Sequence, residues 1–188
     1  MGKNAWVNLR RYSLAAIICA ITVVSACSSS AKPAAAPASV TTGPYSVVDY
    51  KGLTQKHVTT PVRYPQTPPV GGDHHPRWQN CGFYDAVIVP EKGVHSMEHG
   101  AVWITFKPDL AASDVTKIKL LTNATPYVLA SPFDGLPSPV VATAWGHQLV
   151  LSGIDDPGLV AFITKFANSP DSPEPGAVCS GADGTPIA

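Results

Sequence analysis

The chain has 188 residues, 45% of them hydrophobic and only 14% charged, which excludes an intrinsically disordered protein with little apolar surface to bury. Lys plus Arg and Asp plus Glu number 13 each, so there is no basic excess to attract nucleic acid, and no nucleic-acid partner is expected. The 15 glycines and 19 prolines exclude a compact helical bundle and indicate many turns.

The N-terminus has the pattern of a secretion signal. Basic residues precede an apolar run over residues 14–24, which is shorter than the roughly 20 residues that span a bilayer. The run ends in Val-Ser-Ala-Cys at 24–27, which resembles a bacterial lipobox and implies cleavage before Cys27 and acylation of that cysteine. We therefore predict a lipoprotein signal peptide over 1–26 and an exported protein, anchored by lipid on the outer face of the bacterial cell membrane. The alternative is that this segment is an uncleaved anchor helix. Whether the protein has a protein partner is unknown from the sequence.

Residues 27–43 have neither aromatic side chains nor an apolar period. Such a stretch cannot bury enough surface to become ordered, so it is predicted to be a flexible tether. A single globular domain is expected over residues 44–188.

Within that domain, β-branched and aromatic runs predict strands, and apolar residues at helical spacing predict helices. Five prolines over residues 59–76 predict a long irregular loop. The expected strands lie at 45–50, 83–89, 101–106, 127–130, 140–145 and 148–152, and the expected helices at 113–121 and 156–166. This order predicts an α+β fold, in which a largely antiparallel sheet carries two helices on one face and Pro/Gly-rich loops connect the elements.

Two cysteines remain once Cys19 is assigned to the leader and Cys27 to the lipid anchor. Cys81 and Cys179 would be exported into an oxidising compartment, which favours one disulfide between them. Closing so long a loop is worth about 4–5 kcal/mol. The alternative is that Cys81 is a thiolate metal ligand.

Four of the six histidines fall in two short groups, Asp-His-His-Pro at 73–76 and His-Ser-Met-Glu-His at 95–99. Imidazole is the commonest metal ligand in proteins, so the groups predict a metal site. Gly93 and Gly100 flank the second group, and a strong strand follows. We therefore expect residues 95–99 to be extended, because a helix of five residues between glycines would not hold.

In an extended segment, His95, Met97 and His99 project to one side. A thioether beside imidazoles favours copper, with zinc second, and the predicted ligands are His74, His95, His99, Met97 and Glu98. We expect His74 and at least one of the other two histidines to converge. The His-x-x-Glu-His spelling of an inverted zinc-protease motif needs a helix, which this segment is not expected to form.

The predicted function is therefore binding of a transition metal by a lipid-anchored envelope protein, with no catalytic residue assigned. Two alternatives stay open. One is a hydrolase in which Glu98 acts as general base beside a metal or a histidine. The other is a structural or partner-binding lipoprotein without a metal, in which the cluster only fixes the Pro-rich loop to the sheet.

The sequences Gly-Gly-Asp-His-His-Pro-Arg-Trp-Gln-Asn-Cys-Gly at 71–82 and Val-His-Ser-Met-Glu-His-Gly at 94–100 resemble a bacterial family of secreted proteins and lipoproteins. The family is catalogued as domain of unknown function 3105, and the resemblance covers roughly residues 45–180. It implies that the family's motif positions here include His74, His95, Glu98, His99, Cys81 and Cys179. It implies no activity. The family has Leu where this chain has Met97, and Ser in place of Gly71, so the resemblance supports a His/Glu site more than a particular metal.

Overall fold

The computed structural model describes residues 37–42 and 45–188 of the chain. The predicted signal peptide, the predicted acylation site at Cys27 and most of the predicted tether lie outside these residues. Within the part that is described, no helix combines the length and the apolar character needed to cross a membrane.

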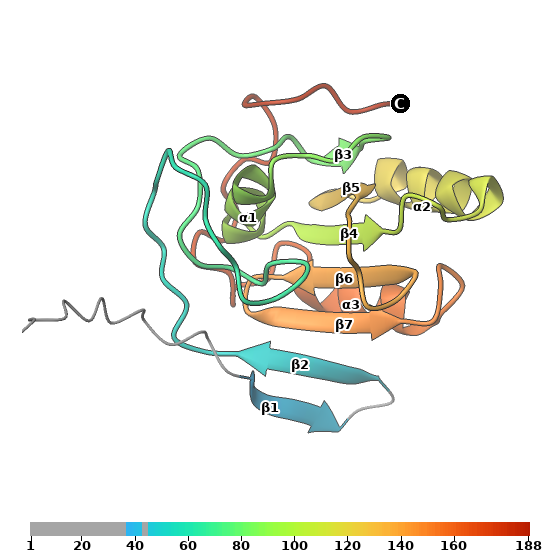
Figure 1. The fold of residues 1–188 in the computed structure, drawn as a ribbon, viewed down its shortest axis with the longest axis horizontal. Coiled ribbons are helices and arrows are strands. Elements are labelled where there is room, and N and C mark those ends of the chain that lie inside the picture. Colours follow the sequence, from blue (N-terminus) through green and yellow to red (C-terminus); the bar gives the residue numbers. More distant parts are fainter. Residues whose placement is uncertain (1–36, 43–44) are drawn as a thin grey trace, which may run out of the picture. The chain divides into compact units, whose positions relative to one another are not determined.

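One seven-stranded sheet organises the described residues, with strand order β1-β2-β7-β6-β4-β5-β3 (Figure 1). The pairs β4–β5 and β3–β5 are parallel and the other neighbours are antiparallel, which confirms the predicted α+β fold with a largely antiparallel sheet. The strands are β1 Pro37–Thr42, β2 Ser46–Tyr50, β3 Gly82–Phe83, β4 Val102–Phe106, β5 Val128–Pro132, β6 Val140–Ala144 and β7 His147–Leu151. The helices are α1 Pro90–Glu98, α2 Ala112–Ala124 and α3 Gly158–Phe166.

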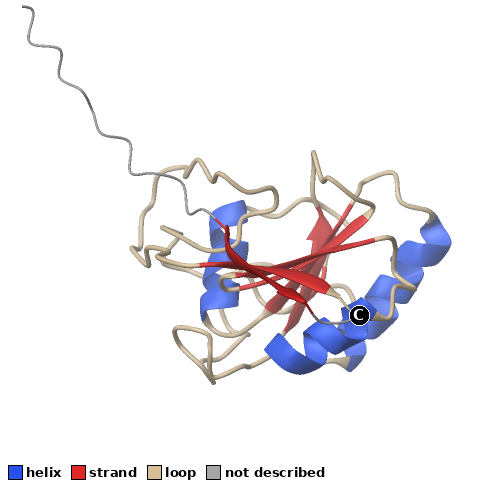
Figure 2. Cartoon of the chain, turned by 90° about the horizontal axis from the view of Figure 1, so that it is seen from below, coloured by secondary structure: helices blue, strands red, loops and turns tan. Residues whose placement is uncertain are grey.

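Helices cover both faces of the sheet (Figure 2). Because strand side chains alternate in direction, Ile104 of β4 joins the apolar cluster that contains Ile118 of α2 and Phe162 of α3. Trp103 points the other way and packs in a second cluster with Met97 of α1. The two predicted helices therefore do share one face, and α1 on the opposite face is an additional helix.

Helix α1 corrects the expectation that residues 95–99 are extended and that a strand runs from 83 to 89. The strand has only the two residues of β3, and the helix begins at Pro90, where the missing N–H is not needed. Glycine is required at position 93, because an ideal Cβ there would lie 2.7 Å from the Trp103 ring and collide with it. Burial against the sheet thus outweighs the weak helix propensity of a short segment.

Two irregular segments are tied to α1 by backbone hydrogen bonds. In the first, His75 N–H donates to the Glu91 carbonyl at 3.3 Å, and the chain around His57 pairs in parallel with the chain around His74. In the second, Glu174 N–H donates to the Glu98 carbonyl at 3.0 Å. The helix that carries three predicted ligands, His95, Met97 and Glu98, is therefore enclosed by chain from both ends of the domain.

The predicted disulfide between Cys81 and Cys179 is confirmed. The two Cα atoms are 5.3 Å apart, within the range that a disulfide spans. Cys81 N–H also donates to the Cys179 carbonyl at 2.7 Å. The bond fixes the C-terminal segment beside the start of β3, and it makes Cys81 unavailable as a thiolate ligand.

Candidate metal centre

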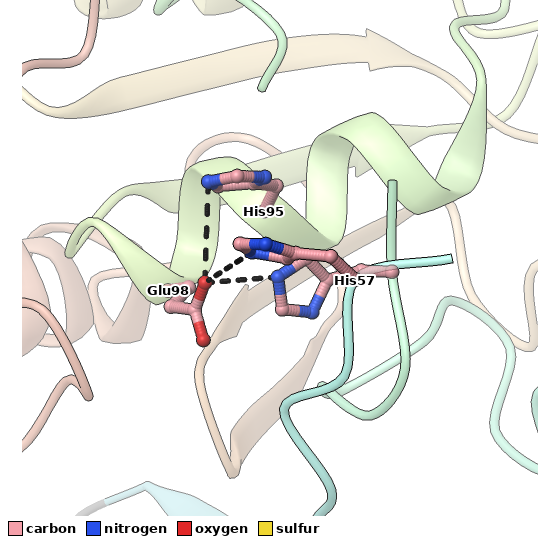
Figure 3. Close-up of side chains that lie close together, drawn as sticks. His57, His95 and Glu98 are labelled. Atoms are coloured by element: carbon pink, nitrogen blue, oxygen red, sulfur yellow. Dashed lines mark hydrogen bonds and ion pairs between the residues drawn. The ribbon is translucent and has the colours of Figure 1, made fainter. Parts of the chain in front are cut away.

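Three imidazoles and one carboxylate meet beside α1. One ligand atom from each of His57, His74, His95 and Glu98 lies within 4.8 Å of all the others. Measured to Glu98 Oε2, the Nε2 atom of His74 is at 2.9 Å, that of His57 at 3.6 Å and that of His95 at 3.9 Å. Figure 3 shows the rings of His57 and His95 directed toward the Glu98 carboxylate. This group can hold a metal ion.

The helical conformation brings two of these ligands together, because residues three apart lie on the same face of a helix. His95 and Glu98 are such a pair in the last turns of α1. His74 reaches them from the Pro-rich loop and is fully buried, whereas the His57 side chain is 48% exposed. The cluster is therefore closed toward the protein core and reaches solvent at His57.

Backbone carbonyls orient the two buried imidazoles. Nδ1 of His74 donates to the Gly72 carbonyl at 2.8 Å, and Nδ1 of His95 donates to the His75 carbonyl at 2.6 Å. Because a carbonyl only accepts, each Nδ1 must carry the proton, and each Nε2 faces Glu98. Metal-binding histidines are typically held in this way, with the second ring nitrogen bonded to a carbonyl.

The residues of the cluster differ in the direction of their pKa shifts. Burial alone lowers the pKa of His74, but the hydrogen bonds to Glu98 and to the Gly72 carbonyl outweigh it, and the pKa is raised. Burial raises the pKa of Glu98, yet the hydrogen bond and positive charge of His74 lower it on balance. Burial, opposed by the bond to the His75 carbonyl, lowers the pKa of His95 to about 4. At neutral pH, His95 is thus neutral and presents a lone pair, as a metal ligand must.

The other predicted ligands lie in two different places. His99 is buried one turn beyond His95, with its Nε2 atom 3.0 Å from the Nε2 atom of His95, but it does not belong to the four-residue group. Met97 is fully buried in the second apolar cluster with Val94 and Trp103. Its thioether contributes to packing on the other side of α1.

The expected convergence of His74 with His95 or His99 is confirmed, since His74 and His95 both lie in the group. The contribution of His57 was not foreseen. It is a single histidine in an irregular segment, and only its pairing with the chain at His74 brings it to the site. The inverted zinc-protease motif needs a helix, and none was expected here from the sequence. The structure has one, with His95 and Glu98 in α1 and His99 at its C-cap.

Comparison with known proteins supplies a family and no activity. No curated protein matches the chain, and no solved structure matches it. Residues 56–181, which include all four clustered residues and the disulfide, match the family described as protein of unknown function (DUF3105). The chain belongs to this family, as its histidine motifs implied.

Proposed function

We propose that this protein binds a divalent first-row transition metal through His57, His74, His95 and Glu98. The observation that carries the proposal is the convergence of three imidazole nitrogens and a carboxylate oxygen, all within 4.8 Å of one another. Zinc and copper sites place such ligands about 2.0–2.2 Å from the ion, so ligand atoms separated by roughly 3–4 Å are already close to the required spacing. Only small side-chain movements are needed to close the site around an ion.

The donor set favours copper(II), with zinc second. The soft ligands that would select copper(I) are used elsewhere, because Met97 packs in the core and both domain cysteines form the disulfide. Three nitrogen donors and one oxygen donor suit copper(II) and zinc, and copper(II) binds such a set more tightly in the general order of divalent metals.

The location of this binding is proposed to be the outer face of a bacterial cell membrane, with the protein held there by a lipid on Cys27. The lipobox-like sequence at 24–27 supports this location, as does the disulfide, which indicates an oxidising compartment. The exposed His57 supports exchange of the ion with the surroundings, so the protein would sequester or pass on metal rather than bury it permanently.

The proposal is tested by calorimetric titration of the purified protein, free of any histidine tag, with zinc and then with copper(II). His74→Ala should weaken binding at least about 100-fold, because changing even a residue that only supports a metal ligand costs 10–100-fold. His75→Ala is the matched control, since the neighbouring imidazole only contacts the backbone of Arg77. His57→Ala, at a half-exposed position, tests the site with little risk to folding. Equal affinity in wild type and both ligand variants would refute the proposal.

A hydrolase is a second candidate, favoured by the helical placement of His95, Glu98 and His99. Glu98, however, is 3% exposed and bonded to His74, which supports holding an ion more than activating water for an incoming substrate. Cleavage of a generic peptide by the zinc-loaded protein, lost in Glu98→Gln, would favour the hydrolase.

A further inference from the structure

We propose a second cation position, formed by His95, His99 and Glu174 and adjoining the first. It rests on the proposed metal-binding function and extends that function from one ion to two. When both positions are filled, His95 serves the second ion, because one imidazole nitrogen binds one ion. The first ion then keeps His57, His74 and Glu98, so that each ion has two imidazoles and one carboxylate.

The main observation is a short contact between two buried imidazole nitrogens, in rings that each donate from the other nitrogen to a backbone carbonyl. Nε2 of His95 and Nε2 of His99 are 3.0 Å apart. Nδ1 of His95 donates to the His75 carbonyl at 2.6 Å, and Nδ1 of His99 donates to the Val178 carbonyl at 2.7 Å. Each Nδ1 therefore carries a proton, and the short contact between the two Nε2 atoms is bridged either by one further proton or by a metal ion.

A buried contact of this kind needs a positive charge between the nitrogens. Both rings are only 3% exposed, so solvent is not placed to separate them. A zinc ion about 2.0–2.1 Å from each nitrogen fits a separation of 3.0 Å at a nitrogen–metal–nitrogen angle of roughly 95°, near the tetrahedral range. The i, i+4 spacing of His95 and His99 on α1 produces this separation without further adjustment.

Glu174 supplies a negative charge beside the two imidazoles. Its Oε2 atom lies 3.5 Å from Nε2 of His99, which matches the spacing of ligand atoms in the first group. Its backbone is fixed, because Glu174 N–H donates to the Glu98 carbonyl at 3.0 Å. Its side chain is 54% exposed, so this position, like the first, has one ligand that solvent and incoming ions can reach.

The C-terminal segment holds the second position together. The Val178 carbonyl that orients His99 directly precedes Cys179, which the disulfide ties to Cys81. One side of the position is therefore α1, and the other is a segment that the disulfide fixes beside the start of β3. A purely structural account has a single proton shared between the two imidazoles, with Glu174 as its counter-ion, and it predicts no second zinc.

The experiment counts zinc ions on the purified, tag-free protein by native mass spectrometry, and calorimetry with zinc alone gives their affinities. Two ions are expected on the wild type and one on His99→Ala. Glu174→Gln, at an exposed position, should weaken the second ion about tenfold or more and leave the first within a few-fold. Asp171→Asn makes the same charge change three residues earlier in the same loop, and it should still bind two ions.

Each result decides between the two proposals. One zinc on the wild type would overturn the second position and leave the proposed function standing. Two zincs on both Glu174→Gln and His99→Ala, with unchanged affinities, would also overturn it. No zinc on the wild type would refute both proposals.

Discussion

Replacing Gly93 by alanine tests whether the close approach of α1 to the sheet positions the metal ligands. A Cβ at this position would lie 2.7–2.9 Å from three atoms of the Trp103 ring. The ring cannot easily move away, because Trp103 is fully buried and its Nε1–H donates to Ser131 Oγ at 3.0 Å. Overpacking of this kind costs about 1–3 kcal/mol, whereas alanine returns at most about 1 kcal/mol of helix propensity. Gly93→Ala should therefore lower the free energy of unfolding by up to about 2 kcal/mol.

Urea denaturation of wild type, Gly93→Ala and Gly153→Ala measures this difference. Gly153 is the control, since no heavy atom lies within 4 Å of an ideal Cβ there, and its variant should stay within about 0.5 kcal/mol of wild type. Gly93→Ala should also weaken zinc binding, because a displaced α1 moves His95 and Glu98 away from His74. A Gly93→Ala protein with wild-type stability and zinc affinity would show that the contact does not position the site.

Two further predictions concern stability. Replacing Cys81 and Cys179 by serine opens a loop of 98 residues, and urea denaturation should show a loss of about 5 kcal/mol by the chain-entropy estimate; an equally stable variant would contradict it. Asp156 accepts hydrogen bonds from Gly158 N–H and from Ser152, so Asp156→Ala should cost about 1 kcal/mol at pH 7. The pKa of Asp156 is lowered below 3.8, chiefly by the backbone hydrogen bond from Gly158. The stabilisation is therefore present above pH 3.8 and is lost as the pH falls through the folded-state pKa. The difference in free energy of unfolding between wild type and Asp156→Ala should accordingly decrease on acidification, and a difference independent of pH would refute the assignment.

Strands β4 to β7 and the helices α2 and α3 were predictable because their patterns are local, whereas β1 falls in residues that were predicted to be a flexible tether. Val102 to Phe106 is a continuous β-branched and aromatic run, and Asp156 precedes a strongly apolar helix with Pro157 at its start. These signals lie within the elements themselves. The disulfide was predictable from counting, since two cysteines remain in an exported domain.

Helix α1 was not predictable in the same way, because its stability comes from packing. Its sequence, from Pro90 to Glu98, contains a glycine and has no run of strong helix formers. What stabilises the helix is the burial of Val94 and Met97 against Trp103, a contact with a strand that comes later in the chain. Local propensity cannot report such a contact, so the interpretation of residues 95–99 as extended was wrong, although one of their two histidines, His95, belongs to the clustered group.

The irregular segments, which made the fold hard to predict from the sequence, also supply the backbone carbonyls that orient the histidines. In helices and strands, backbone carbonyls are engaged in the regular hydrogen bonds of those elements. Gly72, His75 and Val178 lie in irregular chain, and their carbonyls accept hydrogen bonds from Nδ1 of His74, His95 and His99 respectively. Three imidazoles are thereby fixed with Nδ1 bonded to the backbone, so that Nε2 of His74 and His95 faces the cluster and Nε2 of His99 faces His95. Regular secondary structure would offer few such acceptors, so a chain rich in proline and glycine around α1 is what this arrangement of histidines requires.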